Sequence, residues 1–405
     1  MPRAIALLSR LSTLAFALSL LGVAPGCDGG DSSSATAGAG GGGEGGTAGG
    51  GAGGTAGAGG AGGGDFVMQP HPAFPVIPGM KSAVIASPKL VTITFQDDPN
   101  ASTVEAAGDH IGTSEWLAEI GPDYGVGKGT HIAKVVLQED APPALSEPDL
   151  IAKVDALILA GEIPAPTPDT IYMMYVAGQT VFDDGYGYYV CDDYLGYHWQ
   201  LEATSGTLTY AIVGDCGRGI EEVTSTFAHE YIEAASDPGP EGGFYLQLSD
   251  TDPWYSQDGL ENADLCDYAE YVVEDGFTYQ RVWSNSRAAE AITSPCAPID
   301  PDEVFYDVYA EPAMIPEVGA GESAMFTLTG WSAGPVADWE LTYDAEYYGE
   351  FVPEVTLSET TINNGKTVTI TLKVPSGTPG GLLGTAMIYS GDGYGRFWPV
   401  SVWSK

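Results

Sequence analysis

The sequence predicts two folded units in series: an α/β domain with a mixed sheet plus helices over residues 65–299, and an all-β domain over residues 300–405. In the first unit, apolar runs with strand character alternate with runs of helical period, the pattern of a layered α/β sheet. After Pro298, short β-rich runs separated by turn sequences replace this alternation. Residues 28–64, in front of both units, are nearly all Gly, Ala, Ser and Thr and lack aromatic residues, so they cannot bury enough apolar surface to fold.

Residues 1–27 have the features of an export signal. Arg3 and Arg10 precede an apolar run at 11–23 that is too short to span a membrane, and small residues follow it. Cys27, directly after Gly26, predicts a lipoprotein-type signal in which this cysteine becomes the lipid-modified first residue. The unusual Pro25 leaves ordinary signal cleavage as the alternative. We therefore expect an exported protein at a bacterial cell envelope or surface. Its only membrane contact would be the lipid, with residues 28–64 as a tether of roughly 30 Å.

The expected elements follow from local periodicity. In the α/β domain, strands are expected at 90–95, 132–137, 171–176 and 208–213, and helices at 104–120, 149–160 and 220–237. In the all-β domain, strands are expected at 305–309, 323–328, 339–343, 367–374, 384–389 and 397–403. This spacing favours a sandwich of immunoglobulin-like type, although the Cys-Trp-Cys framework of true immunoglobulin domains is absent from the sequence.

The helix that ends before Pro238 carries the motif His229-Glu230-x-x-Glu233. At 3.6 residues per turn, His229 and Glu233 lie roughly 40° apart around the axis. Their imidazole and carboxylate can therefore occupy two positions around one metal ion. Glu230 projects about 100° from His229, where metallopeptidases of the His-Glu-x-x-His type keep a general base. The alternative interpretation is an ordinary amphipathic helix with both glutamates in solvent.

Further candidate ligands lie outside this helix. Glu261 and Asp264, three residues apart, follow downstream, and Glu261 is predicted to be the third metal ligand. Asp264 can replace it in that role, or orient His229 as a hydrogen-bond acceptor. His198 has two interpretations: a partly buried structural histidine beside a sheet, or a residue that contacts substrate or metal. The remaining histidines that we considered, His71, His110 and His131, are expected to be structural or exposed.

Four ordered blocks of this sequence resemble the EXORDIUM-type, phosphate-induced secreted proteins of plants and their bacterial relatives. The matching residues are Gly196, Tyr197, His198, the run 210–216, His229, Glu230, Glu233, Asp237, Pro238, Glu261, Asp264, Cys266, Gln280, Trp283, Ser284, Asn285 and Cys296. Tyr279 stands where that family has Val, a departure that affects packing more than chemistry. The resemblance covers about residues 89–296, and it implies a secreted, zincin-like domain in a bacterial member of the family.

Five cysteines are few for a chain of 405 residues, so the fold depends on its core. If Cys27 carries lipid, Cys191, Cys216, Cys266 and Cys296 remain, and they allow three pairings. Cys266 with Cys296 is the first choice because both flank the expected strand at 283–285, and the other two then pair by elimination. A cysteine metal site is the alternative, but the chain has no Cys-x-x-Cys spacing.

The composition restricts the partners. Fourteen Lys and Arg residues against 55 Asp and Glu residues give a formal net charge of −41, so nucleic-acid binding is not expected. The first functional hypothesis is a zinc (Zn²⁺) metallohydrolase acting on peptides or proteins, with His229, Glu233 and Glu261 as metal ligands and Glu230 as the base. The second is a non-catalytic surface protein that binds cell-wall or polysaccharide material.

Overall fold

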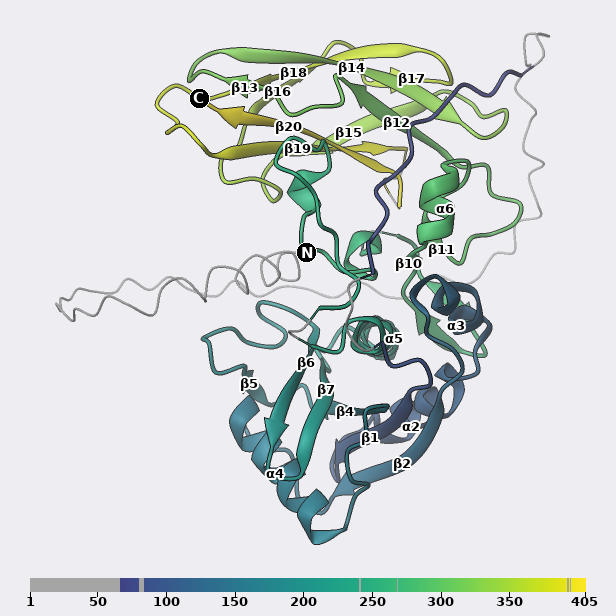
Figure 1. Ribbon diagram of the computed structural model, residues 1–405, viewed down its shortest axis with the longest axis vertical. Helices are drawn as coiled ribbons and strands as arrows, with labels where there is room; N and C mark the ends of the chain where they lie inside the picture. Colours follow the sequence, from purple (N-terminus) through teal and green to yellow (C-terminus); the bar gives the residue numbers. More distant parts are fainter. Residues whose placement is uncertain (1–65, 80–83, 240–241, 268, 392, 394) are drawn as a thin grey trace, which may run out of the picture.

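The computed structural model describes residues 66–405 apart from 80–83, 240–241, 268, 392 and 394. Residues 1–27, with the predicted lipidation site Cys27, and the predicted tether 28–64 lie outside the described residues. The described chain is a mixed α/β region with a largely parallel sheet, followed by a region of antiparallel sheets (Figure 1). None of the helices in the described chain combines the length and apolar character needed to cross a membrane.

The central sheet has the order β2-β1-β4-β7-β6. Its strands are β1 Lys89–Phe95, β2 Thr130–Leu137, β4 Thr170–Val176, β6 Gly196–Ala203 and β7 Gly206–Gly214. The first four strands in this order run parallel, and β6 pairs antiparallel with β7 at the edge. The four predicted strands are therefore confirmed. The edge strand β6 was not predicted, and it carries His198.

The two faces of this sheet belong to two apolar cores. Alternation along β4 sends Ile171, Met173 and Tyr175 into one core with helices α2 Ala101–Ile111, α3 Glu115–Ile120 and α5 Ile220–Ser236. The intervening residues Tyr172 and Met174 enter the other core, where helix α4 Glu147–Ala160 packs. The three central strands β1, β4 and β7 are therefore buried on both faces, as strands of mainly parallel sheets generally are.

Two local expectations need correction. The single helix expected at 104–120 is two helices, because the helix is interrupted at Gly112 and Thr113. Ser114 then caps α3 by accepting a hydrogen bond from Leu117 N. The strand expected at 283–285 is only β10 Val282–Trp283. Ser284 instead caps helix α6 Asn285–Glu290. In both places a serine side chain accepts a hydrogen bond from one of the free N–H groups in the first turn of a helix.

Short elements connect these units. They are the 3-10 turns η1 Gly121–Tyr124, η2 Tyr255–Gln257 and η3 Asp264–Cys266, and the strands β3 Ala144–Ser146, β5 Val181–Asp183, β8 Val272–Glu274, β9 Phe277–Tyr279 and β11 Cys296–Ala297. Both predicted disulfides are confirmed: Cys191 is bonded to Cys216, and Cys266 to Cys296.

The C-terminal region consists mainly of two sheets, drawn in green and yellow in Figure 1. One has the order β12-β14-β18-β16 and the other β13-β20-β19-β15-β17, with only the β13–β20 pairing parallel. The strands are β12 Tyr306–Glu311, β13 Glu317–Val318, β14 Ser323–Ser332, β15 Trp339–Asp344, β16 Glu354–Leu357, β17 Thr361–Ile362, β18 Thr367–Lys373, β19 Leu383–Ser390 and β20 Phe397–Ser404. Apolar side chains from both sheets enter one core, including Leu328 and Ile370 from the first and Leu341 and Val400 from the second.

The two regions share apolar contacts. The Trp254 ring lies 5.3 Å from that of Trp398 and 5.4 Å from that of Phe397 (centroid distances). Two hydrogen bonds also cross, from Trp403 Nε1 to Asp250 O and from Ile315 N to Thr251 O. The boundary at residue 299 stays a prediction, and the units that it separates are packed against each other.

Candidate metal centre

Helix α5 is enclosed on all sides. It packs against strands β4, β6 and β7 of the central sheet (Figure 1) and also against β9. Every residue from Val223 to Ser236 is buried, with Glu230 2% and Glu233 3% exposed. The alternative of a solvated, amphipathic motif helix is therefore wrong, because the helix lies inside the core and its charged groups need partners there.

His229 meets two carboxylates through one ring nitrogen. Its Nε2 lies 2.9 Å from Glu233 Oε2 and 3.6 Å from Asp264 Oδ1. Asp264 is on the short η3 turn, which the disulfide Cys266–Cys296 joins to β11. These three side chains form a group whose ligand atoms all lie within 4.8 Å of one another.

The other nitrogen of His229 fixes the state of the ring. Gln280 Nε2 donates to Ala263 O and to Asp267 Oδ1. A carbonyl oxygen can only accept a hydrogen bond, and so can the carboxylate of Asp267 while it is ionised. Gln280 therefore turns its Oε1 towards His229 Nδ1, 3.0 Å away, and Nδ1 must carry the proton. The electron pair of Nε2 then faces Glu233 and Asp264, so a proton or a cation has to lie between these electron-rich atoms.

His198 makes a parallel arrangement from strand β6. Its Nε2 donates to the main-chain carbonyl of Asp237 at 2.8 Å. Its Nδ1 lies 3.4 Å from Glu230 Oε2 and 3.8 Å from Glu233 Oε2. His198, Glu230 and Glu233 form the second group whose ligand atoms lie within 4.8 Å of one another. The structure thus brings this histidine to the motif helix.

Glu233 belongs to both groups, and its two oxygens have different partners. Oε1 accepts hydrogen bonds from the backbone N–H groups of Ala263 and Asp264, at 3.1 and 3.2 Å. Oε2 is the oxygen that faces the two histidines. The backbone bonds hold the carboxylate in one orientation, so Oε2 is fixed at the centre of the cluster.

The predicted third ligand, Glu261, lies on the His198 side. Its Oε2 is 3.6 Å from His198 Nε2, and it belongs to neither of the two groups. Asp264, the alternative ligand, belongs to the His229 group. In the structure, Asp264 and not Glu261 therefore forms a group of possible ligands with His229 and Glu233.

The cluster carries more negative than positive charge. Its ionisable members are His198, His229, Glu230, Glu233, Asp237, Glu261, Asp264 and Asp267. Two unit charges of the same sign about 4 Å apart repel by roughly 4 kcal/mol at an effective dielectric constant of 20. Six carboxylates against two imidazoles in a buried volume need protons or cations to be stable.

The pKa values reflect this crowding. Burial, with the charges of Glu233 and Asp237 added, raises the pKa of Glu261 well above its usual range. Burial and the charge of Glu233 do the same for the pKa of Asp264. Burial lowers the pKa of His198, but the contact with Glu230 and the charge of Glu233 outweigh it and bring that pKa to about 9. Without a cation, the cluster takes up protons instead.

The donor atoms fit a metal ion. Ligands about 2.1 Å from an ion are separated from one another by roughly 3.0–3.4 Å. The four nitrogen–oxygen separations in the two groups run from 2.9 to 3.8 Å. Glu230 Oε2 is moreover buried and has no hydrogen-bond partner. A small inward movement of these side chains would bring the three donor atoms of either group to the separations of metal ligands.

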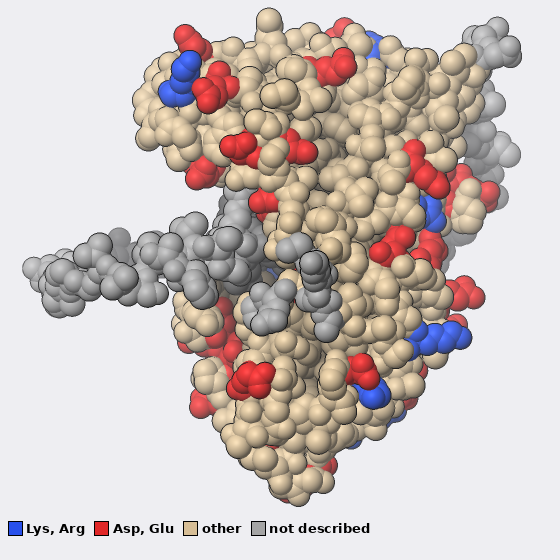
Figure 2. Space-filling model, viewed as in Figure 1, with Lys and Arg blue, Asp and Glu red and all other residues tan. Residues whose placement is uncertain are grey.

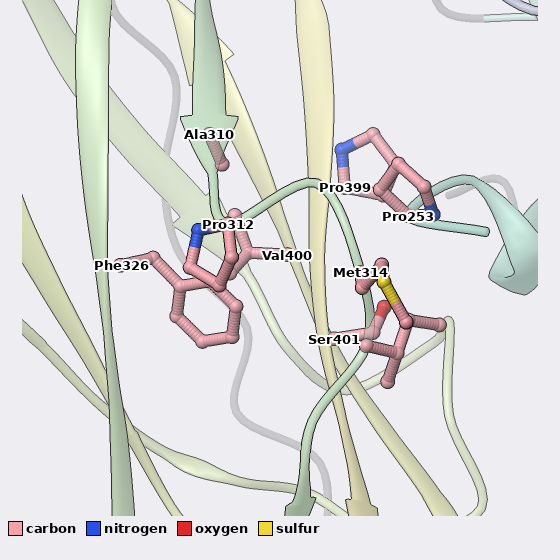
Figure 3. A pocket seen from close by; sticks show the side chains of 9 residues that line it. Pro253, Ala310, Pro312, Met314, Phe326, Pro399, Val400 and Ser401 are labelled. Atoms are coloured by element: carbon pink, nitrogen blue, oxygen red, sulfur yellow. The ribbon is translucent and has the colours of Figure 1, made fainter. Parts of the chain in front are cut away.

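The cavity drawn in Figure 3 lies elsewhere, between Pro253 and strands β12, β14 and β20. It is lined by apolar side chains such as Met314 and Phe326 with a single serine, and its volume is about 10 Å³. It offers neither titratable groups nor room for a substrate. The cavity in Figure 3 therefore has no part in the cluster at α5.

On the molecular surface, acidic side chains are spread over the visible face and basic ones are few (Figure 2).

Sequence reasoning assigned no role to three residues of this centre. Gln280 and Asp237 were recognised only as parts of a motif, and Asp267 was not singled out. Gln280 follows directly after β9, which packs on α5. A polar residue at the end of a strand is a weak signal in the sequence, because the side chain that it orients lies 51 positions away in the chain.

Comparison with known proteins adds little. No family model matches the chain, and no curated protein matches it. Among solved structures, it is similar to the crystal structure of domains 4 and 5 of the S-layer protein SbsC, with 16% identity and a TM-score of 0.20. That match covers 25% of this chain and 46% of the other, so it spans less than half of that structure. A similarity of this size carries no argument about fold or function.

Proposed function

We propose that residues 65–299 form a zinc-dependent hydrolase of the zincin-like class that acts on peptide bonds. The observation that carries the proposal is the orientation of His229, whose Nε2 faces Glu233 and Asp264 because Gln280 Oε1 accepts a hydrogen bond from Nδ1. One imidazole and two carboxylates are ligands that zinc accepts, and catalytic zinc sites use three protein ligands. The resemblance to EXORDIUM-type proteins supports the same assignment.

The proposal includes the setting of the domain. The two disulfides favour an oxidising compartment, in agreement with an exported protein anchored through Cys27. We propose an immunoglobulin-like sandwich for residues 300–405. A peptide or protein substrate outside the cell would then reach the domain at the end of its tether.

Zinc, when bound, polarises a carbonyl group and lowers the pKa of water. Glu230 is the base of this centre, because its Oε2 has no hydrogen-bond partner and is free to accept a proton. In the metal-free fold, contact with Glu230 and the charge of Glu233 outweigh the lowering effect of burial and raise the pKa of His198 to about 9, and its Nδ1 lies 3.4 Å from that oxygen. The side chain of Glu261 is 21% exposed, against 9% for Asp264, so water can approach the centre beside Glu261.

The test is turnover of a peptide library together with zinc content. Glu230→Gln keeps the shape of the side chain and removes the proton acceptor, so the ion held by His229 should stay while turnover falls by about 100-fold or more. His229→Ala should lose this ion and the activity. Glu222→Gln, on the same helix but paired with Arg218, is the matched control and should behave like wild type. Unchanged activity in Glu230→Gln would contradict the proposal.

The burial of the centre favours a second candidate function. Structural zinc sites are closed, whereas catalytic sites keep an open position, and His229, Glu230 and Glu233 are at most 3% exposed. The alternative is therefore a non-catalytic surface protein, binding cell-wall or polysaccharide material, whose ion stabilises the fold. A wild-type protein with full zinc occupancy and no turnover on peptides would favour this alternative.

A further inference from the structure

Glu233 Oε2 faces two histidines that belong to different groups of ligands. The proposed hydrolase uses the group on the His229 side. The group on the other side, His198, Glu230 and Glu233, contains the same kinds of donor atom at similar separations. The question is what occupies the space between these three side chains.

The orientation of His198 limits the answer. A main-chain carbonyl oxygen can only accept, so the hydrogen bond from Nε2 to Asp237 O places a proton on Nε2. Nδ1 is then the nitrogen with the free electron pair, and it faces Glu230 Oε2 and Glu233 Oε2. This repeats on β6 the arrangement that Gln280 creates for His229. In both groups the far nitrogen is fixed as a donor and the near one faces two carboxylates.

The second carboxylate is held in place without a partner of its own. Glu230 is 2% exposed, and its Oε2 accepts no hydrogen bond. Its Oε1 lies against Gly196, where an added Cβ would come within 2.9 Å of this oxygen and 2.7 Å of Ile212 O. The glycine on β6 therefore lets the motif helix approach the strand closely enough for Glu230 to face His198. A buried carboxylate oxygen without a donor is strongly unfavourable unless a cation is near it.

From this geometry we infer that His198 Nδ1, Glu230 Oε2 and Glu233 Oε2 bind a second divalent cation, and that Glu233 bridges it to the ion held by His229 and Asp264. The inference rests on the proposed function and extends it from a one-ion to a two-ion centre. Two ions about 3.5–4 Å apart are a recognised arrangement in hydrolases, where they hold the attacking and leaving oxygens together. A second dication also brings the charge of the six carboxylates closer to neutrality.

The inference gives Glu230 a different role. One oxygen cannot serve both as a ligand of the second ion and as a base, so in the two-ion protein Glu230 binds metal. In the one-ion protein a proton on His198 occupies the same place. The number of ions bound, and not activity alone, separates these two descriptions.

The test starts from the full chain, from which a chelator has removed bound metal. This protein is titrated with Mn²⁺ and, in a separate experiment, with Zn²⁺. Wild type should bind two equivalents, and its fully loaded Mn²⁺ form should give the exchange-coupled electron paramagnetic resonance spectrum of two neighbouring ions. Glu230→Gln and His198→Gln should each bind one equivalent and give an uncoupled Mn²⁺ spectrum. Glu222→Gln should bind two. Circular dichroism and thermal melting show whether each variant is folded. Because Glu230 and His198 lie on different elements, one variant still tests the site if the other does not fold.

The outcomes separate the two proposals. One equivalent in wild type, with the same value in Glu230→Gln, overturns the second site and leaves the proposed hydrolase intact. Two equivalents in both variants, with an uncoupled spectrum in wild type, also overturns it, because the ions are then bound elsewhere. No bound ion in wild type overturns the metal centre and the proposed function together.

Discussion

Gln280 Oε1 accepts a hydrogen bond from His229 Nδ1 at 3.0 Å, although 51 positions separate the two residues in the chain. The same amide donates to Ala263 O and to Asp267 Oδ1. One side chain thus joins the motif helix to the segment that carries Asp264. It determines which nitrogen of His229 is available to a metal ion.

We predict that Gln280→Leu weakens zinc binding by about 10–100-fold, the usual effect of losing a partner that orients a histidine ligand. Zinc titration with a competing chelator measures the change. Gln257→Leu is the control, because Gln257 is equally buried and its amide donates to Ser256 Oγ. If both variants lose zinc affinity to the same extent, the effect comes from general destabilisation and not from the orientation of His229.

The disulfides should differ in their effect on the centre. Cys266 lies two positions after Asp264, at the end of η3, and its bond to Cys296 anchors that turn. Replacing both cysteines by serine should cost about 2–5 kcal/mol of unfolding free energy and reduce zinc affinity. The same change at Cys191 and Cys216 should cost a similar amount, by chemical denaturation, with zinc affinity unchanged. Equal loss of affinity in both double variants would show that η3 needs no such anchor.

Chelation should destabilise the protein more at high pH. Burial and neighbouring carboxylates raise the pKa values of Glu261 and Asp264 in the metal-free fold above their ordinary values of 4.5 and 3.8. Groups with a raised pKa in the folded state stabilise it fully below the ordinary value, and this stabilisation is lost as the pH rises through the raised value. Bound zinc replaces the missing protons. The difference in melting temperature between zinc-loaded and chelated protein should therefore be larger at pH 8 than at pH 5.

A second pH effect should come from the C-terminal region. Burial raises the pKa of Asp307 from 3.8 to about 7, against the lowering effect of its hydrogen bonds from Val308 N and Ser390 Oγ. Its contribution to stability is therefore complete below about pH 4 and lost as the pH rises through about 7. Asp307→Asn keeps an oxygen acceptor and cannot ionise, so it should raise the melting temperature at pH 8 and change it little at pH 4. The exposed Asp302→Asn should have no such pH-dependent effect, and a flat difference for Asp307→Asn would contradict this account.

The sequence by itself determined the features that depend on neighbouring residues. The strands β1, β2, β4 and β7 follow from short β-rich runs, and the helix α5 from apolar spacing up to Pro238. The approach of His229 to Glu233 follows from the 3.6-residue turn alone. The breaks at Ser114 and Ser284 were also readable, because serine before a helical run is a common N-cap. The expected helix at 104–120 and the expected strand at 283–285 follow residue patterns that run past these capping serines.

Only the tertiary structure decided which distant groups meet these residues. His198 reaches α5 because β6 pairs antiparallel with β7, with His198 opposite Ala211, and Gly196 allows the close approach. Asp264 joins His229 and Glu233 because backbone N–H groups of its own turn hold Glu233 Oε1. The physical reason is the range of the interactions. Backbone dihedral angles determine which side chains meet within one helical turn. The contacts between segments about 30 to 50 residues apart depend on how the whole core packs, and no local sequence pattern encodes that packing.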